Sequence, residues 1–299
     1  MDLRAPAINQ QLDAWINEDL GRGDLTKDAI EEKTTTASWI TNHEGVFCGG
    51  ELVEKIYARL DEKVNVNLIF SDGDLIHRND ELLTLRGPSS SLLAGERTAL
   101  NIAMHLSGIA TATQTLVKEL EGTNVKLADT RKTTPGLRVF EKYAFQCGGG
   151  TNHRLGLDDA AMIKENHLAW SKGDLEVSIG IIRSRAPWTS LIIVEAETAF
   201  QAEEALKAGA DGILLDEMSI NELQKLIPHL RKMAKNRQQK HYSNHVFLEA
   251  SGVDPSKLKG YASTGVDFIS TSAPMTRSHW LDFSMRFTEL NESKNLIDH

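Results

Sequence analysis

The sequence predicts an α/β fold in which a mixed α/β N-terminal part precedes a parallel β/α barrel. Two observations predict it. After residue 122, short apolar runs alternate with helical stretches, which is typical of parallel strands joined by crossover helices. Almost every one of these runs also ends in a polar or charged residue. A chain of 299 residues is long enough for a barrel and a second domain.

The N-terminal part mixes helical and extended patterns. Its expected elements are an amphipathic helix at 8–20, extended stretches at 36–47 and 64–70, a turn at 71–74, and a long helix at 92–120. Gly108 lies inside the long helix and is a candidate break.

Six short, largely apolar runs are expected to be strands covered on both faces: residues 125–129, 160–164, 191–195, 212–216, 246–249 and 267–270. Six units leave the barrel incomplete, unless a further strand lies in the glycine-rich stretch near Cys147. Residues 231–245 are expected to form a solvated helix end and loop. The tail after residue 287 is expected to fray or to return to the first domain.

Polar residues follow these runs directly: Asp129, Lys164, Glu195, Asp216, Glu249 with Ser251, and Ser270. In a β/α barrel the carboxyl ends of the strands converge on one face, where active sites are built. These side chains are therefore expected to share one pocket. The alternative is that each merely marks the end of a strand.

Composition excludes several classes of protein. A hydrophobic fraction of 40% argues against disorder, and a net charge of −9 argues against nucleic-acid binding, which leaves a basic footprint. No run is apolar enough for a membrane span, and the N-terminus lacks a signal core, so a soluble, cytosolic protein is expected. Cys48 and Cys147 have no metal-site or disulfide spacing and are interpreted as idle thiols.

Although the net charge of the chain is negative, residues 131–164 form a basic stretch. Arg131 and Lys132 follow the first barrel strand, and together they suit a ligand with several anionic groups. Three successive glycines from Gly148 lead to His153 and Arg154 and allow close backbone approach. This run matches neither the dinucleotide fingerprint nor a P-loop.

Several motifs carry a resemblance to a known family. They are 18–26 (EDLGRGDLT), 96–101 (ERTALN), 106–111 (LSGIAT), 129–136 (DTRKTTPG), 148–154 (GGGTNHR), 163–167 (IKENH) and 215–216 (LD). With these motifs, over nearly its whole length, the chain resembles quinolinate phosphoribosyltransferase, the decarboxylating nicotinate-nucleotide pyrophosphorylase of NAD synthesis.

The resemblance implies an N-terminal α/β sandwich domain, residues 1–105 completed by 276–299, and an open, incomplete β/α barrel of residues 106–275. It implies a homodimer, or a higher assembly of dimers, in which Arg97 of one subunit enters the partner's site. The residues that it implies for binding quinolinate and 5-phosphoribosyl 1-diphosphate are Arg131, Lys132, His153, Arg154 and Lys164. Glu195 and Asp216 are expected to serve the ribose and Mg²⁺, directly or through water.

The 5′-phosphate is expected at two late loops, at Ser251, Gly252 and Val253, and at Ser272. The family usually has a glycine at the position of Val253 and another at the position of Ser272. Val253 is expected to remove the freedom of positive φ and to add bulk. These two departures are therefore expected to affect the geometry of the loops and their affinity for phosphate.

The implied reaction transfers the phosphoribosyl group to quinolinate and releases CO₂ and diphosphate. Lys132, Lys164, Glu195 and Asp216 are the expected catalytic residues. Three alternatives stay open: a Schiff-base lyase using Lys164, a non-catalytic sensor of phosphorylated metabolites, and a paralogue acting on another ring acid.

Overall fold

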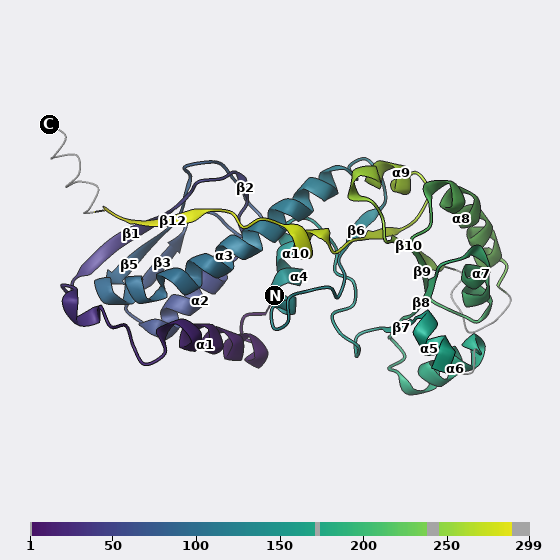
Figure 1. Cartoon of the computed structure of the whole chain (residues 1–299), viewed down its shortest axis with the longest axis horizontal. Coiled ribbons are helices and arrows are strands. Elements are labelled where there is room, and N and C mark those ends of the chain that lie inside the picture. The colour runs from purple at the N-terminus through teal and green to yellow at the C-terminus, as the bar shows by residue number, and fades with distance from the viewer. Residues whose placement is uncertain (1, 171–173, 238–244, 289–299) are drawn as a thin grey trace. The chain divides into compact units, whose positions relative to one another are not determined.

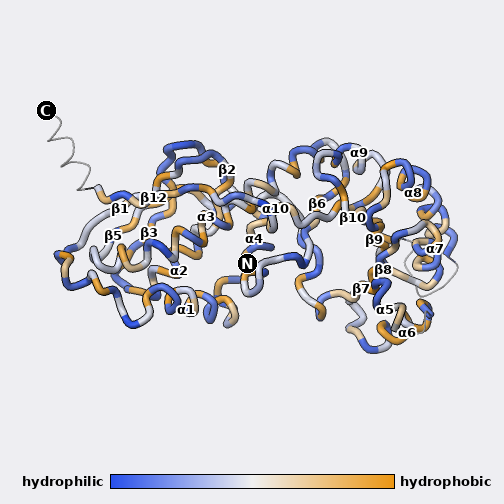
Figure 2. The backbone as a smooth tube through the Cα atoms, in the orientation of Figure 1, coloured by the Kyte–Doolittle hydropathy of each residue, from blue (hydrophilic) through white to orange (hydrophobic). Residues whose placement is uncertain are grey.

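The computed structural model describes residues 2–170, 174–237 and 245–288, and the chain divides into two compact units. The first comprises Met1–Gln114, Thr134–Gly149 and Arg277–His299, and the second comprises Thr115–Thr133 and Gly150–Thr276. The tail that was expected to fray or to complete the first domain lies, beyond residue 288, outside the described residues. Hydrophobic and hydrophilic stretches alternate along the backbone of both units (Figure 2).

The first unit is built on a four-stranded antiparallel sheet with the order β12-β1-β5-β3 (Figure 1). Its strands are β1 (Thr34–Thr41), β3 (Asn65–Leu68), β5 (Glu81–Pro88) and β12 (Phe283–Phe287), and β2 (Gly45–Val46) pairs separately with β4 (Leu75–Ile76). Buried residues alternate along β1, so one face of the sheet packs on the core. The helices of this unit are α1 (Pro6–Leu20), α2 (Gly50–Leu60), α3 (Ser89–Lys118) and α4 (Arg138–Cys147).

Helix α3 is continuous, so the expected break at Gly108 is wrong. A Cβ atom at Gly108 would lie 2.2 Å from the carbonyl oxygen of His279. The glycine therefore serves close packing, because the segment that leads into β12 crosses the helix there with no room for a side chain. A sequence pattern cannot distinguish such a glycine from a helix breaker.

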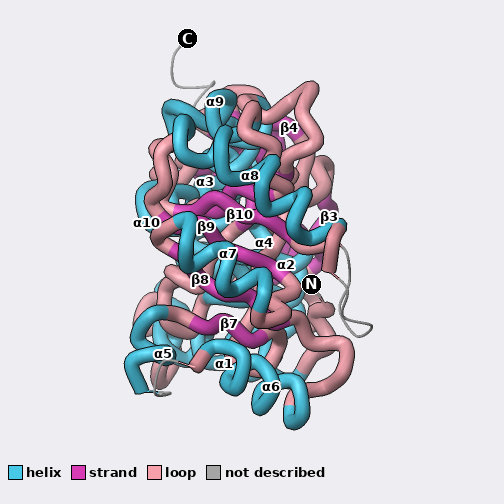
Figure 3. Tube along the Cα trace, turned by 90° about the vertical axis from the view of Figure 1, so that its right-hand side faces the viewer, coloured by secondary structure: helices cyan, strands magenta, loops and turns pink. Residues whose placement is uncertain are grey.

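The second unit contains a six-stranded parallel sheet with the order β6-β11-β10-β9-β8-β7. All six expected strands are present: β6 (Lys126–Ala128), β7 (Ala161–Ile163), β8 (Ile192–Ala196), β9 (Gly212–Asp216), β10 (Phe247–Ser251) and β11 (Phe268–Ser270). The helices are α5 (Glu165–Trp170), α6 (Leu175–Arg185), α7 (Ala199–Lys207), α8 (Ile220–Lys235), α9 (Leu258–Ala262) and α10 (Ala273–Arg277). Figure 3 shows β7 to β10 stacked in order, with α7 and α8 lying in front of them.

The barrel is open, because β6 and β7 are the two edges of the sheet. The glycine-rich stretch contributes one more residue: Thr151 forms an isolated parallel bridge to Ala128 beside β6. The extra strand considered near Cys147 is thus reduced to a single bridge, and Cys147 itself ends α4.

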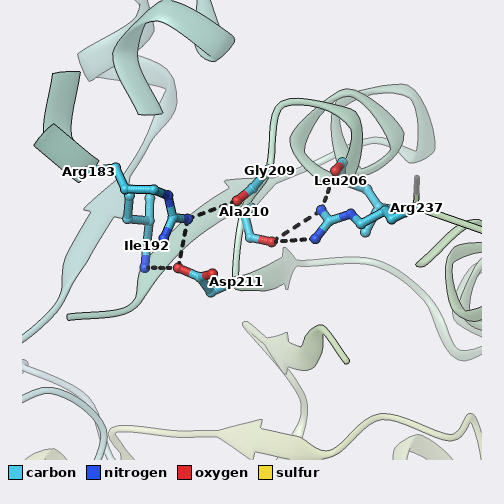
Figure 4. A network of polar contacts seen from close by, with 7 residues as sticks. All are labelled: Arg183, Ile192, Leu206, Gly209, Ala210, Asp211 and Arg237. Carbon is cyan, nitrogen blue, oxygen red and sulfur yellow. Dashed lines mark hydrogen bonds and ion pairs between the residues drawn. The ribbon is translucent and has the colours of Figure 1, made fainter. Parts of the chain in front are cut away.

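The amino ends of the strands are tied by a recurring Arg–Asp contact. Asp211 accepts hydrogen bonds from the backbone N–H of Ile192 (2.9 Å) and from the Arg183 guanidinium (3.0 Å), which also donates to the carbonyl of Gly209 (Figure 4). Asp267 repeats the arrangement with Arg231 (2.8 Å) and the N–H of Leu248 (2.8 Å). At two places in the sheet, one carboxylate thus bridges the start of a neighbouring strand and a helix.

Residues 231–245 were expected to form a solvated helix end and loop, and the described part of this range agrees in outline. Helix α8 ends at Lys235, and Lys232, Lys235, Asn236 and His245 are exposed. Two arginines of the range are held by contacts: Arg231 is engaged with Asp267, and Arg237 donates to the carbonyls of Leu206 and Ala210 (Figure 4). None of the described helices combines the length and apolarity needed to span a bilayer.

Candidate active site

Strand register builds a cavity at the carboxyl ends of the second unit's sheet. Glu195 of β8 and Glu249 of β10 both pair with Leu214 of β9, so these three side chains lie at one level. Two residues further along, Asp216 pairs with Ser251. The cavity of about 310 Å³ is lined by Asp129, Thr130, Arg131, Lys132, His153, Arg154, Met162, Lys164, Glu195, Leu214, Asp216, Glu249, Ser251 and Ser270. The structure thus brings the polar strand ends together.

Two guanidinium groups share this cavity. The pKa of Arg154 is lowered, first by burial and then by the nearby Arg131 cation. Arg154 is anchored by a hydrogen bond from Nη1 to the carbonyl of Ala160 (2.9 Å), which keeps it beside Arg131 despite the repulsion. Cations held together in this way are stabilised by a bound anion.

His153 is fixed through both ring nitrogens. The backbone N–H of Arg154 donates to Nδ1 (2.7 Å), and Nε2 lies 3.1 Å from Oε2 of Glu249. The His153 backbone N–H donates to Asp129 (2.8 Å), which is fully buried. Sequence reasoning placed Asp129 and Glu249 at strand ends but gave them no role. Only the fold reveals that they hold the loop that follows the glycines.

Lys164 and Glu195 form an ion pair within the cavity. Lys164 follows β7 directly, and its side chain is 42% exposed, whereas that of Glu195 is 14% exposed. The amine of Lys164 is thus already engaged by a carboxylate, whereas a Schiff-base lysine must present its amine to a carbonyl group, so the pair disfavours the lyase alternative.

Three cavity side chains keep a buried polar atom without a partner among the described residues. They are Nε of Arg131, Oε1 of Glu249 and Oγ of Ser270. Buried polar atoms are normally hydrogen-bonded, and exceptions concentrate where a ligand completes the network. Arg131, Glu249 and Ser270 therefore retain unused hydrogen-bonding capacity beside the cavity.

Glu195 and Asp216 are two carboxylates that line the same cavity. Among the described residues, no third His, Cys, Asp or Glu completes a metal cage with them. Mg²⁺ is commonly held by one or two carboxylates together with substrate phosphates, and it keeps several waters. The donor set thus suits a magnesium ion that arrives with a phosphorylated substrate.

The two expected phosphate loops lie at the ends of β10 and β11, and only Ser251 of their four expected residues lines the cavity. Gly252 has φ +67°, and a Cβ there would lie 2.7 Å from Cγ of Glu217 and 3.3 Å from Oδ1 of Asp216. Val253 is not among the described residues with positive φ, so the expected loss of freedom there strains nothing. Ser272 precedes α10, and its carbonyl accepts from the N–H of Met275.

Arg97 does not line this cavity. It lies in the first unit, exposed on α3, beside a hollow of about 630 Å³ that also involves Trp15, His105 and Trp280. Of the expected site residues, Arg97, Gly252, Val253 and Ser272 are therefore outside the cavity, and the other eight line it.

The chain matches two family models, which together cover most of its length. The model of the C-terminal domain of quinolinate phosphoribosyl transferase matches residues 109–286, and that of the N-terminal domain matches residues 24–107. The chain belongs to this family. The resemblance seen in the sequence is thereby confirmed, and so is the expected pairing of an N-terminal α/β domain with an open β/α barrel.

Individual members of the quinolinate phosphoribosyl transferase family agree. The probable nicotinate-nucleotide pyrophosphorylase [carboxylating] of Synechocystis is 38% identical over 281 residues, covering 93% of this chain and 92% of the relative. The relative of the same name from Bacillus subtilis is 38% identical and covers 96% and 95%. The solved nicotinate-nucleotide pyrophosphorylase from Francisella tularensis superposes with a TM-score of 0.86 at 33% identity, covering 95% of this chain and 98% of that one.

Proposed function

We propose that this family member transfers the phosphoribosyl group of 5-phosphoribosyl 1-diphosphate to quinolinate, giving nicotinate mononucleotide, diphosphate and CO₂ in NAD biosynthesis. The observation that carries the proposal is the cavity, which is lined by cationic side chains (Arg131, Lys132, Arg154 and Lys164) together with the carboxylates of Glu195 and Asp216. Both substrates are anionic, and one carries a ribose. The cationic side chains match the negative charge of the substrates, and the carboxylates match the hydroxyl groups of the ribose.

Electrostatics explains why an acidic protein can hold such substrates. Two unit charges 4 Å apart interact by about 1 kcal/mol in water and by about 4 kcal/mol at an effective dielectric of 20. Arg131 and Arg154 are partly buried, so the lower effective dielectric, and therefore the stronger interaction, applies to them. Arg131 and Arg154 would bind the ring carboxylates by paired hydrogen bonds, whereas Lys132 and Lys164 would supply compact charges.

In the first step, the bond between the anomeric carbon and diphosphate breaks, and the ring nitrogen of quinolinate bonds to that carbon. Positive charge develops on the ribose as diphosphate leaves, and cationic side chains that hold the leaving group lower the barrier. Glu195 and Asp216 would accept hydrogen bonds from the ribose hydroxyls and orient the sugar. Lys164 would be held toward the reacting centre by its ion pair with Glu195.

In the second step, the carboxylate next to the quaternary ring nitrogen leaves as CO₂. The electron pair stays on the ring carbon, where the positive nitrogen stabilises it until a proton arrives. The protein needs only to position and desolvate that carboxylate. Arg154, which is tied to Ala160, is a fixed group that could do so.

Magnesium and a homodimer belong to the same proposal. Glu195 and Asp216 would hold Mg²⁺, directly or through water, and the ion would neutralise charge on the diphosphate. Arg97 is exposed and lies outside the cavity lining, which supports its reaching into the site of a partner subunit, in a dimer or an assembly of dimers.

The test is to incubate the purified protein with quinolinate, 5-phosphoribosyl 1-diphosphate and Mg²⁺, and to measure nicotinate mononucleotide and CO₂. Arg131→Ala should lower kcat/KM at least about 100-fold, the scale of losing a key electrostatic group. Arg185→Ala is the matched control, because Arg185 is exposed on α6. A parallel reaction with nicotinate, which lacks the leaving carboxylate, separates a paralogue that acts on another ring acid. Wild-type turnover by Arg131→Ala would overturn the assignment.

A further inference from the structure

The only two cysteines of the chain meet inside the first unit. Both are free, and the fold brings Sγ of Cys48, Sγ of Cys147 and a carboxylate oxygen of Asp72 within 4.8 Å of one another. Cys48 lies between β2 and α2, whereas Cys147 is the last residue of α4. Because the two cysteines are far apart in the sequence, the sequence alone does not predict this contact.

The surroundings hold Cys48 rigidly. Its backbone N–H donates to Oγ of Ser107 (2.9 Å), and its carbonyl accepts from the same hydroxyl (3.2 Å). Asp72 accepts from the N–H groups of Gly49 (2.9 Å) and Gly50 (2.8 Å) through Oδ1, and from the hydroxyl of Tyr143 (2.8 Å) through Oδ2. Asp72 therefore has a structural role of its own at the start of α2 and is not needed as a metal ligand.

The two thiols are chemically unequal. Cys48 is completely buried, and burial is the main cause that raises the pKa of its thiol. The pKa of Cys147 is lowered, chiefly by a hydrogen bond with the Cys48 side chain and further by one with Tyr143, although burial and Asp72 oppose this. Cys147 is also partly exposed. A partly exposed thiol beside a fully buried one is the arrangement of an attacking and a resolving cysteine.

We propose that Cys48 and Cys147 are a redox modification site, which a peroxide converts into a reversible intrachain disulfide. The Cys147 sulfur, as the thiolate, attacks one peroxide oxygen and the O–O bond breaks; the sulfur is oxidised to sulfenic acid, and the other oxygen leaves, reduced, as hydroxide or alkoxide. The Cys48 sulfur then bonds to the Cys147 sulfur, the S–O bond breaks, and the hydroxyl leaves as water with the Cys48 proton. A dithiol reductant restores both thiols.

The two sulfur atoms start within reach of each other. A disulfide requires sulfur atoms about 2.0 Å apart, so the two Sγ atoms must approach by at most about 3 Å for the bond to form. Both cysteines lie against α3: Cys48 is bound to Ser107, and a Cβ at Gly148, next to Cys147, would lie 2.3 Å from the carbonyl of Ala110. The disulfide would thus join two segments that pack on the same helix.

The test uses the full chain, reduced with dithiothreitol, freed of metal with a chelator and exposed to hydrogen peroxide. Intact mass should fall by two hydrogen atoms, and digestion should yield one peptide pair joining Cys48 to Cys147, which dithiothreitol reverses. In Cys48→Ser, a sulfenic acid should instead accumulate at Cys147 and react with dimedone. In Cys147→Ser, Cys48 should be oxidised at least about tenfold more slowly, because it is buried and protonated.

Two results would overturn the proposal. One is retention of both thiols, or cross-linking between chains, while the peroxide is consumed by a control dithiol. The other is stoichiometric zinc in the unchelated protein that is lost from Cys48→Ser, which would make these residues a metal site with Asp72. The wild-type peptide map alone decides the matter if either variant fails to fold.

Discussion

His153 and Glu249 are joined across 3.1 Å, from Nε2 of the imidazole to Oε2 of the carboxylate. Because Nδ1 accepts the backbone N–H of Arg154, the ring proton lies on Nε2 and is donated to Glu249. Glu249 therefore selects the tautomer and the orientation of His153. Its second oxygen is buried and without a partner among the described residues.

Glu249→Ala should reduce kcat more than it raises KM, because His153 loses the partner that orients it. Leaving a buried N–H unpaired costs about 1–3 kcal/mol, which corresponds to a loss of about fivefold to 150-fold if it is expressed in the transition state. Glu249→Gln keeps an acceptor oxygen and should recover much of the rate. Steady-state kinetics and thermal melting of both variants check this. Equal losses in Ala and Gln would contradict a positioning role.

Lys164→Ala should leave the fold intact and lower kcat/KM at least about 100-fold, since Lys164 supplies charge inside the cavity and organises Glu195. The matched control is Lys232→Ala, an exposed lysine on α8. The double variant with Glu195→Gln should lose less than the sum of the single losses, because the two side chains act as a pair. Strict additivity in free energy would argue that the ion pair is idle.

The contacts of Glu141 can be tested through the dependence of the free energy of unfolding on pH. It is fully buried in the first unit, 3.0 Å from Nε2 of His105 and 3.0 Å from the N–H of Thr134. Burial alone raises the pKa of Glu141, but the hydrogen bonds from His105 and Thr134 outweigh it, so the pKa lies below the usual value of 4.5.

A lowered carboxyl pKa stabilises the fold above the unfolded pKa, and that stabilisation disappears as the pH falls through the folded pKa. Urea unfolding should therefore show wild type losing stability below about pH 4.5. Glu141→Gln should be less stable at neutral pH and should lose less on acidification. Glu44→Gln, at an exposed position of the same unit, should follow wild type. The idea fails if Glu141→Gln and wild type have parallel pH profiles.

The fold followed from the sequence wherever period and composition decide structure. All six barrel strands were predictable, because short apolar runs bounded by charged residues have few other solutions. Their convergence also placed Lys164, Glu195 and Asp216 correctly in one cavity. Contacts between distant segments were not predictable. From the sequence, Gly108 is a candidate helix break, and only the structure shows that it makes room for the backbone at His279. Likewise, the sequence places Glu249 at a strand end, and only the structure shows that it contacts His153.

Gly252 and Val253, in the loop after β10, differ in backbone conformation, because only Gly252 has a positive φ. Gly252→Ala should weaken 5-phosphoribosyl 1-diphosphate binding and raise its KM. Its φ of +67° disfavours a side chain by about 1–2 kcal/mol. A Cβ there would also press on Glu217 and lie close to Asp216. Val253→Gly, which restores the glycine usual in the family, should change KM far less, since Val253 is not held at positive φ. A larger effect at Val253 than at Gly252 would mean that bulk at Val253, not backbone geometry at Gly252, governs phosphate binding.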